Sequence, residues 1–112
     1  MKTRTRLRGT DVFSAIGDPT RRKVLEMLTR RNFAAGEIAM HFRISRPAVS
    51  QHLHVLRRAK LVDVRRRGRE RIYRLNPEPL QEVYDWVEHY RKFWNSRMSA
   101  LGEYLDRASK GR

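Results

Sequence analysis

The chain has 112 residues, enough for one domain with a modest core and too few for a two-domain enzyme. Its 26 lysines and arginines outnumber 12 acidic residues, and the net charge of +14 indicates a polyanion as the binding partner. The absence of cysteine excludes disulfides, zinc fingers and thiolate metal sites, and no apolar run reaches the roughly 18 residues of a membrane span. We therefore expect a cytoplasmic protein with no membrane partner.

The positive charge is concentrated in one part of the chain. Residues 1–10 carry +4, residues 11–42 carry +1, residues 43–74 carry +9, and residues 75–112 are neutral overall. Because about two-thirds of the excess lies in one block, residues 43–74 are the predicted polyanion-binding surface. Residues 1–10 form a basic N-terminal arm, for which a phosphate-binding role and a disordered tail both stay open.

Two helices are predicted in the first third of the chain. Residues 11–16 form a short helix that ends at a Gly-Asp-Pro break. Its apolar side consists of Val12, Phe13 and Ile16. Asp18 caps the second helix, and Pro19 takes its first position, where the missing N–H of proline costs nothing. Leucine and valine at helical spacing predict that this helix runs to about Arg31.

A third, shorter helix is predicted from Gly36 to about Phe42, after a loop that contains Phe33. No residue at the start of this helix has a good capping side chain, so its first residue is loosely defined. The apolar residues that it would bury are Ile38, Ala39 and Phe42.

The fourth predicted helix runs from Arg46 to Ala59, with Ser45 as a strong N-cap. At 100° per residue, one stripe of this helix is apolar and the opposite side is polar and basic. The apolar stripe consists of Val49, Leu53 and Leu56. The opposite side consists of Pro47, Ser50, Gln51, His54 and Arg58, flanked by Arg46 and Arg57.

A two-stranded hairpin follows, because residues 61–64 and 72–75 are β-branched and alternating, and a glycine lies in the segment between them. Its tip carries Arg65, Arg66, Arg67 and Arg69. Asn76 and Pro77 then cap and open a long final helix. The apolar stripe of that helix consists of Leu80, Val83, Tyr84, Val87, Tyr90, Trp94, Met98, Leu101 and Leu105. So small a chain has little core to cover this stripe, so a second copy is the natural partner.

Four helices, a hairpin and a last helix predict a mainly α fold with a two-stranded β-wing, a winged helix-turn-helix, over residues 11–108. The third and fourth helices, joined by residues 43–45, would place the exposed face of residues 46–58 in the major groove of duplex DNA. Gln51 suits adenine, and the wing at residues 62–75 would contact a minor groove or phosphates. The predicted DNA-binding residues are Arg43, Ser45, Arg46, Pro47, Ser50, Gln51, His54, Arg57, Arg58, Arg65, Arg66, Arg67 and Arg69.

The four histidines do not form a metal site by their spacing. His52 and His54 point about 160° apart on their helix, and His89 has only carboxylates nearby on its own helix. His52 lies at the edge of the apolar stripe, and we expect it to pack or to bond to the backbone rather than to touch DNA. There is no glycine-rich phosphate loop and no paired set of catalytic carboxylates, so we expect neither a metal, nor a cofactor, nor an enzyme.

Taken in order, these motifs resemble the ArsR family of bacterial winged-helix repressors over about residues 11–105. The motifs are Asp18-Pro19-Thr20-Arg21-Arg22 with Val24, Leu25 and Leu28, then the run from Ile44 to Leu53 with Leu56, and Ala59-Lys60-Leu61-Val62. The resemblance implies a homodimer joined through the first and last helices, which reads a palindromic operator with half-sites about 34 Å apart. It also implies repression by occluding a promoter, often the repressor's own. The predicted dimer contacts are Val12, Phe13, Ile16, Val83, Val87, Tyr90, Trp94, Met98, Leu101 and Leu105.

The chain departs from the metal-sensing members of that family. One type of metal-sensing member looks to carry cysteines in the third helix, where this chain has residues 38–41. Another type looks to carry an Asp-x-His pair and a later histidine in the last helix, where this chain has Asp85, Val87 and His89. Both metal sites are absent from this chain. The chain instead resembles a metal-independent branch with the Asp-Pro-Thr-Arg-Arg motif, and its inducer is unknown. Two alternatives stay open: a metal- or small-molecule-sensing repressor of the same fold, and a non-specific nucleic-acid-binding protein.

Overall fold

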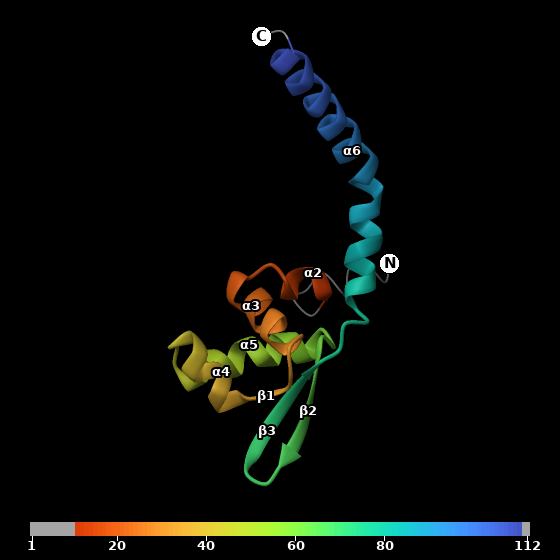
Figure 1. The fold of residues 1–112 in the computed structure, drawn as a ribbon. Helices are drawn as coiled ribbons and strands as arrows, with labels where there is room; N and C mark the ends of the chain where they lie inside the picture. Colours follow the sequence, from red (N-terminus) through yellow and green to blue (C-terminus); the bar gives the residue numbers. More distant parts are fainter. Residues whose placement is uncertain (1–10, 111–112) are drawn as a thin grey trace. The chain divides into compact units, whose positions relative to one another are not determined.

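The computed structural model describes residues 11–110 (Figure 1). The described residues form two compact units, which meet in the sequence between Gln81 and Glu82. The first unit holds the helices α2 to α5 and a small sheet, and the second consists of the helix α6 (Leu80–Lys110) beyond its first two residues. The predicted basic arm, residues 1–10, lies outside the described residues. No helix in the described part of the chain is long and apolar enough to cross a membrane.

Aspartate caps begin the first two helices. α2 (Val12–Ala15) starts at Asp11, whose Oδ1 accepts a hydrogen bond from the N–H of Ser14 at 2.8 Å. α3 (Pro19–Leu28) starts at Asp18, so the predicted cap and the predicted proline position are confirmed. The expected end near Arg31 is wrong, because the Thr29 hydroxyl donates to the carbonyl of Glu26 at 2.6 Å and closes the last turn.

The wing contains a third strand that the sequence did not predict. β1 (Phe33–Ala34) pairs antiparallel with β3 (Glu70–Leu75), and the sheet order is β1-β3-β2. The predicted loop at Phe33 is therefore wrong, and so is the predicted two-stranded sheet. Two residues are too few to show the alternation that marks a strand, and this strand exists only through its partner. Phe33 also lies under the guanidinium of Arg31, with 3.7 Å between that group and the ring centre.

α4 (Ala35–Phe42) begins without a capping side chain at Ala34, as expected. The reciprocal bond of a capping box is present, since Oε1 of Glu37 accepts the N–H of Ala34 at 2.8 Å. That hydrogen bond, with a second from Arg31 at 3.3 Å, holds the pKa of Glu37 below its usual value. The helix start is thus one residue earlier than predicted, and it depends on the glutamate in its first turn.

The hairpin of β2 (Val62–Arg67) and β3 is longer than predicted and extends away from α3, α4 and α5 (Figure 1). Gly68 and Arg69 form its two-residue turn, and Gly68 has a φ of +64°, which a two-residue hairpin turn requires at its first position. Three arginines placed in the predicted tip, Arg65, Arg66 and Arg67, are therefore strand residues. Charged side chains are well tolerated there, because β2 is an edge strand.

The junction between α5 (Arg46–Arg58) and β2 is closed by two sets of hydrogen bonds. Lys60 has a φ of +64°, and the N–H of Leu61 returns to the carbonyl of Leu56 at 2.9 Å, which defines a Schellman end. Asn76 donates from its backbone to Leu61 and from Nδ2 to Lys60, each at 2.8 Å. The predicted role of Asn76 as the cap of the last helix is wrong, because α6 starts at Leu80. Oδ1 of Asn76 accepts the N–H of Glu78 at 3.4 Å, in the turn before that helix.

The core of the first unit lies where α3, α4 and α5 meet the base of the sheet. Its side chains are less than a tenth exposed and come from every element of the unit. They include Val12, Val24, Leu28, Ile38, Val49, Leu53, Leu56, Leu61, Val62 and Tyr73. Burying each large aliphatic side chain contributes about 1.5–3 kcal/mol, so this core fixes the position of α5 relative to the wing.

Candidate nucleic-acid interface

Three residues connect α4 to α5. Arg43 ends α4 in the left-handed region at φ 55° and ψ 39°, and its N–H donates to the carbonyl of Ala39 at 3.0 Å. Ser45 begins α5, because its hydroxyl oxygen accepts the N–H of Ala48 at 3.2 Å. The sharp turn at Arg43 and the cap at Ser45 set two helices at an angle with a short link, which is a helix-turn-helix.

α5 presents one face to the core and the opposite face to solvent. Val49, Leu53 and Leu56 are buried, as the helical spacing predicted. Ser50, Gln51 and His54 are exposed. All the predicted DNA-binding residues, from Arg43 to Arg69, are exposed in the structure. Their contact with DNA stays a prediction, but each of them is accessible to a ligand.

The register of the hairpin divides the wing arginines between two faces. Arg66 pairs with Arg71 and Val64 pairs with Tyr73, so these four side chains share the face that contains the buried Tyr73. The predicted cluster at the tip is therefore wrong as a single group, because alternation along β2 puts Arg65 on the other face. That other face holds Arg67, Glu70, Ile72, Arg74 and Asp63.

A groove runs between α5 and β3 on the buried-tyrosine face. Two adjoining hollows form it, and both are lined by Ser50, Leu53, Arg71 and Tyr73. One hollow continues to Gln51, His54 and Arg57 on α5. The other continues to Arg46 on α5, to Arg69 and Glu70 on the wing, and to residues 34–36 at the start of α4. The groove thus joins the helix-turn-helix to the wing with a basic lining.

Arg71 is the site residue that sequence reasoning missed. It was counted in the basic block, but the hairpin was expected to begin its second strand at residue 72. In the structure β3 begins at Glu70, and Arg71 stands two residues before Tyr73 on the same face. If the second strand had been predicted to start directly after the turn at Gly68, the alternation of side chains along it would have placed Arg71 on the same face as Tyr73.

The Asp-Pro-Thr-Arg-Arg motif has a structural role at the start of α3. Oδ2 of Asp18 accepts the N–H of Arg21 at 2.9 Å, and that hydrogen bond is the main reason that the pKa of Asp18 is lowered. The guanidinium of Arg21 donates to the carbonyl of Ala15 at 2.7 Å, and that of Arg22 donates to the carbonyl of Ile16 at 2.8 Å. The two arginines therefore satisfy carbonyls at the end of α2.

The same motif reaches α5 through His52. Nδ1 of His52 lies 3.3 Å from Nη1 of Arg21 and 3.9 Å from Oδ2 of Asp18. His52 is half-buried against these two side chains, so it packs within the first unit, the first of the two alternatives that the sequence left open. The physical reason is its position at the edge of the apolar stripe, which places it against the start of α3.

The other histidines have separate surroundings. The ring of His41 makes an edge contact with Phe42, with 4.9 Å between the ring centres, and His54 is exposed on α5. Nδ1 of His89 lies 3.1 Å from the carbonyl oxygen of Asp85. Among residues 11–110, no group of three or more His, Asp or Glu side chains is placed to hold a metal ion.

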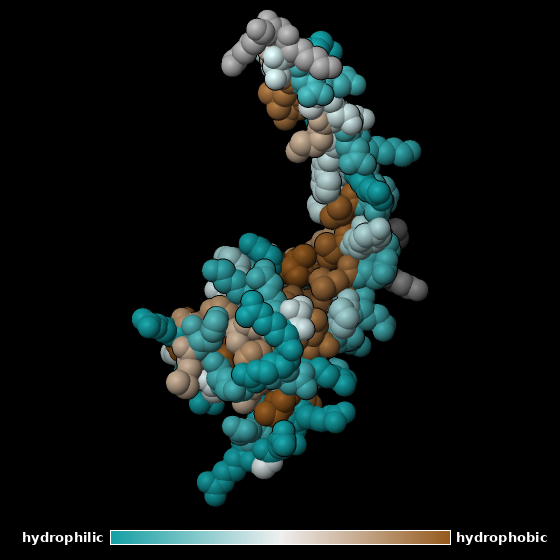
Figure 2. All heavy atoms as spheres, viewed as in Figure 1, coloured by the Kyte–Doolittle hydropathy of each residue, from teal (hydrophilic) through white to brown (hydrophobic). Residues whose placement is uncertain are grey.

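α6 carries a long exposed apolar surface, visible as brown spheres along that helix in Figure 2. Of the predicted dimer contacts, Tyr90, Trp94, Met98, Leu101 and Leu105 are each at least 43% exposed. Val83 and Val87 are half-buried, as are Phe13 and Ile16 of α2, and Val12 is buried in the core. Sequence reasoning left out Trp86, Phe93 and Tyr104, which are also exposed and lie beside the predicted stripe.

A helix-turn-helix whose second helix has a polar exposed face, followed by an arginine-rich β-wing, defines the class of winged helix-turn-helix DNA-binding proteins. Residues 18–64 match the model of the bacterial regulatory proteins of the arsR family. The chain belongs to the ArsR family and is a DNA-binding transcriptional regulator.

Relatives support this assignment across most of the chain. The transcriptional repressor SdpR of Bacillus subtilis is 42% identical over 80 residues, which are 71% of this chain and 89% of that protein. The HTH-type transcriptional regulator Rv2034 of Mycobacterium tuberculosis is 37% identical over 94 residues, 84% of this chain and 85% of that one. An ArsR-like transcriptional regulator from Rhodococcus sp. RHA1 has a solved structure with a TM-score of 0.65 and 31% identity, covering 90% of this chain and 93% of that one.

Proposed function

We propose that the protein is a homodimeric repressor that reads a palindromic operator with the exposed face of α5 and with the wing, and that it needs no metal for this. The observation that carries the proposal is the structure of α5. Val49, Leu53 and Leu56 anchor it in the core, and this leaves Ser50 and Gln51 facing outward beside a basic groove. A rigidly held polar helix face is what reading base edges in a major groove requires.

Base reading is assigned to Gln51 and Ser50, whose side chains can both donate and accept hydrogen bonds. Gln51 can pair with adenine through two bonds. The arginines of α5 and the predicted wing arginines Arg65, Arg66, Arg67 and Arg69 bind phosphates, which fixes the register of the protein on the duplex but carries little sequence information. In this proposal the neutral side chains of Ser50 and Gln51 determine the sequence specificity, and the charged arginines supply most of the affinity.

A second copy is proposed to cover the apolar stripe of α6. Trp94 is 52% exposed, Met98 69% and Leu101 51%, which leaves large apolar side chains in water along several turns. Residues 75–112 have no net charge, so two such helices would associate without strong repulsion. A two-fold dimer would present two copies of α5 and would account for a palindromic operator.

Repression, rather than activation, is supported by relatives that are named repressors, the transcriptional repressor SdpR among them. Independence from metal is supported by the absence of cysteine from the chain and by the separate surroundings of the four histidines. A repressor of this size could act by occupying a promoter, including the promoter of its own gene.

Competition binding tests the proposal. A duplex enriched from a random library by the protein, or a palindrome from its own promoter, competes with random duplex of the same length at a fixed salt concentration. We expect a preference of about 10³ or more for the selected sequence. A preference below about 10-fold would mean that the protein is a non-specific nucleic-acid-binding protein. Salt dependence alone does not separate the two, because phosphate contacts give a steep slope in both.

A zinc titration tests the metal-sensing alternative. Isothermal titration with Zn²⁺ should show no tight site, and operator binding should be the same with and without a chelator. A tight site whose occupancy releases the operator would replace the metal-independent proposal with a metal-sensing one.

A further inference from the structure

By strand register, the Tyr73 face of the wing carries two arginines, of which Arg71 lines the groove between α5 and β3. Arg66 and Arg71 lie directly opposite each other in the register, and both share a face with the buried Tyr73. Opposite residues of an antiparallel pair have Cβ atoms about 5 Å apart, so two like charges there destabilise the free protein. An anion bound between or beside them would remove that repulsion.

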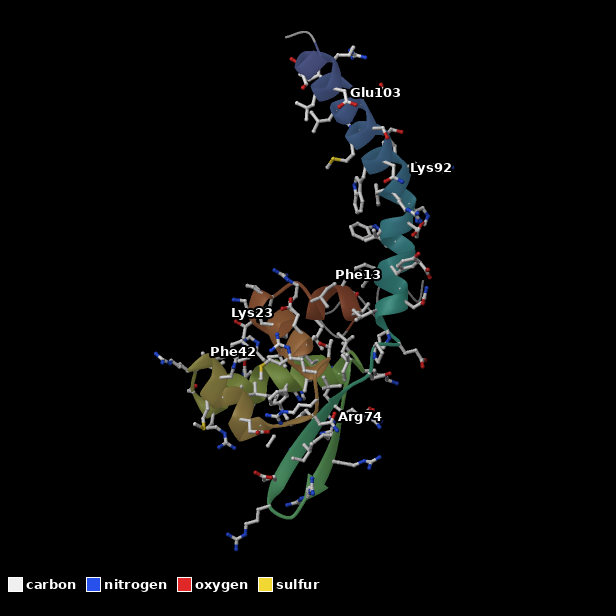
Figure 3. The ribbon with its side chains drawn as sticks, in the orientation of Figure 1. Phe13, Lys23, Phe42, Arg74, Lys92 and Glu103 are labelled. Carbon is white, nitrogen blue, oxygen red and sulfur yellow. The ribbon has the colours of Figure 1, made fainter. Side chains whose placement is uncertain are left out.

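The two faces of the wing differ in how their arginines are neutralised. Arg74, labelled in Figure 3, forms an ion pair with Asp63 at 2.8 Å across the strands on the far face. On the Tyr73 face, neither Arg66 nor Arg71 makes a hydrogen bond or an ion pair with any described residue, and of the two it is Arg71 that lines the groove. One carboxylate, that of Glu70, also lines the groove but makes no ion pair with Arg71, so positive charge predominates on the side of the wing that faces α5.

Arg71 has a central place in that groove. Both hollows between α5 and β3 are lined by it, and among their charged residues Arg71 is the one they share. Arg57 lines one hollow, and Arg46 and Arg69 line the other. Leu53 and Tyr73 line both hollows and are buried, so the base of the groove is fixed by the core.

We propose that Arg71 binds a backbone phosphate of duplex DNA in the groove between α5 and β3, and thereby holds one DNA strand against α5. This rests on the DNA-binding function above and adds Arg71, which lies in the predicted wing but was not among the predicted DNA-binding residues. A guanidinium can donate two parallel hydrogen bonds to a phosphate, which fixes the position of the strand as well as adding affinity. Because a phosphate is the same at every base pair, Arg71 positions the DNA and does not select its sequence.

The test compares Arg71→Gln with Arg74→Gln, since both remove one positive charge from the same strand but from opposite faces. Binding of a random duplex is measured over a range of salt concentrations. Arg71→Gln should weaken binding about 10-fold, the loss expected for one charged hydrogen bond, and should lower the salt slope by about 1. Arg74→Gln should change both quantities by clearly less. Equal effects of the two variants would overturn the proposal.

A second measurement locates the contact on the DNA. Single phosphates of a bound duplex are replaced in turn by neutral methylphosphonate. At one or two adjacent positions, the methylphosphonate should lower the affinity of the wild-type protein and leave the affinity of Arg71→Gln unchanged. A loss in Arg71→Gln that is confined to the operator, with an unchanged salt slope, would show a base contact and would also overturn the proposal.

Separate controls distinguish a loss of DNA binding from a loss of folding, and the role of Arg71 from the repressor proposal. Circular dichroism reports whether Arg71→Gln is folded, and Arg71→Lys replaces it if not. The lysine variant should keep the salt slope and lose part of the affinity, because it keeps the charge without the two-pronged geometry. If Arg71→Lys binds as tightly as wild type, the two-pronged contact is wrong. If wild type prefers no duplex sequence, the repressor proposal fails, while the random-duplex slopes still decide the role of Arg71.

Discussion

Nη1 of Arg21 lies 3.3 Å from Nδ1 of His52, which links the start of α3 directly to the middle of α5. The same guanidinium donates to the carbonyl of Ala15 at 2.7 Å and to that of Ser14 at 3.3 Å. One side chain therefore joins α2, α3 and the helix that we propose reads DNA. The stability of the first unit should depend on it.

Replacing Arg21 tests this link. Arg21→Gln removes the hydrogen bonds to two carbonyls and to His52, and we expect the free energy of unfolding to fall by about 1–3 kcal/mol. Urea denaturation measures the change. Lys23→Gln is the matched control, because it removes the same charge from an exposed position of α3 and should change stability by less than about 0.5 kcal/mol. Equal stabilities of the two variants would contradict the role of Arg21.

Acid should remove the contribution of Asp18 to stability. The N–H of Arg21 is the main cause that lowers the pKa of Asp18 below its ordinary value of 3.8, so the folded state binds this proton less readily than the unfolded state. The stabilisation is therefore present above the unfolded pKa and is lost as pH falls through the folded pKa. Asp18→Asn keeps a capping oxygen without the charge.

Unfolding midpoints of wild type and Asp18→Asn between about pH 2 and 7 check this. The wild type should be the more stable protein near neutrality, and the two curves should converge in acid. The other carboxylates are common to both proteins, so the difference between the curves isolates Asp18. A difference that stays constant across the range would show that charge plays no part in the cap.

The left-handed conformation of Lys60 predicts a stabilising substitution. This residue has a φ of +64° at the end of α5, a position that glycine adopts without the steric cost of a Cβ. Lys60→Gly should raise the free energy of unfolding by about 0.5–1 kcal/mol, because the relief of strain exceeds the added entropy of the unfolded chain. Lys60→Ala removes the charge but keeps the Cβ, and it should not stabilise the protein.

Gln51 and the wing arginines should have different effects on DNA binding. Gln51→Ala should reduce the preference for the operator about 10- to 100-fold, the value of one bidentate base contact, and should leave random-duplex binding nearly unchanged. Arg66→Ala combined with Arg67→Ala should weaken all duplexes alike and lower the salt slope by about 1 to 2. Titrations of both duplexes at several salt concentrations measure these effects. An unchanged operator preference in Gln51→Ala would place another side chain in the groove.

The stripe on α6 predicts that dimerisation is sensitive to one charge. Leu101 is 51% exposed and lies in the stripe, and Leu101→Glu should convert a dimer at micromolar concentration into a monomer in analytical ultracentrifugation. Ser96→Glu places the same side chain on the opposite side of α6 and should leave the dimer intact. A wild-type monomer at that concentration would be incompatible with the proposed assembly.

Local signals were enough to predict most of the first unit. Asp18 and Ser45 accept hydrogen bonds within three residues of themselves, so a cap can be recognised from the sequence next to it. The spacing of Val49, Leu53 and Leu56 likewise predicted the buried face of α5, because helical periodicity is a property of one segment.

Features that depend on distant partners were missed. β1 exists because Phe33 pairs with Tyr73, which is 40 residues further along the chain. Asn76 was assigned to the nearest helix, whereas its amide donates to Lys60 at the end of α5. Arg71 was identified as a site residue only from the strand register, which places it on the same face as Tyr73. In each case the prediction needed to know which distant segment of the chain contacts the residue, and the local sequence does not contain this information.

The order of the strands has a consequence for solubility. β2 is paired on one side only, so its other side offers unpaired backbone groups to which a strand of another molecule could add. Arg65, Arg66 and Arg67 occupy half of β2 and oppose such growth, since a second basic strand laid against them would be repelled. The arginines that we propose bind DNA thus also oppose aggregation through this edge strand. Variants in which these three arginines are replaced by neutral residues should precipitate more readily.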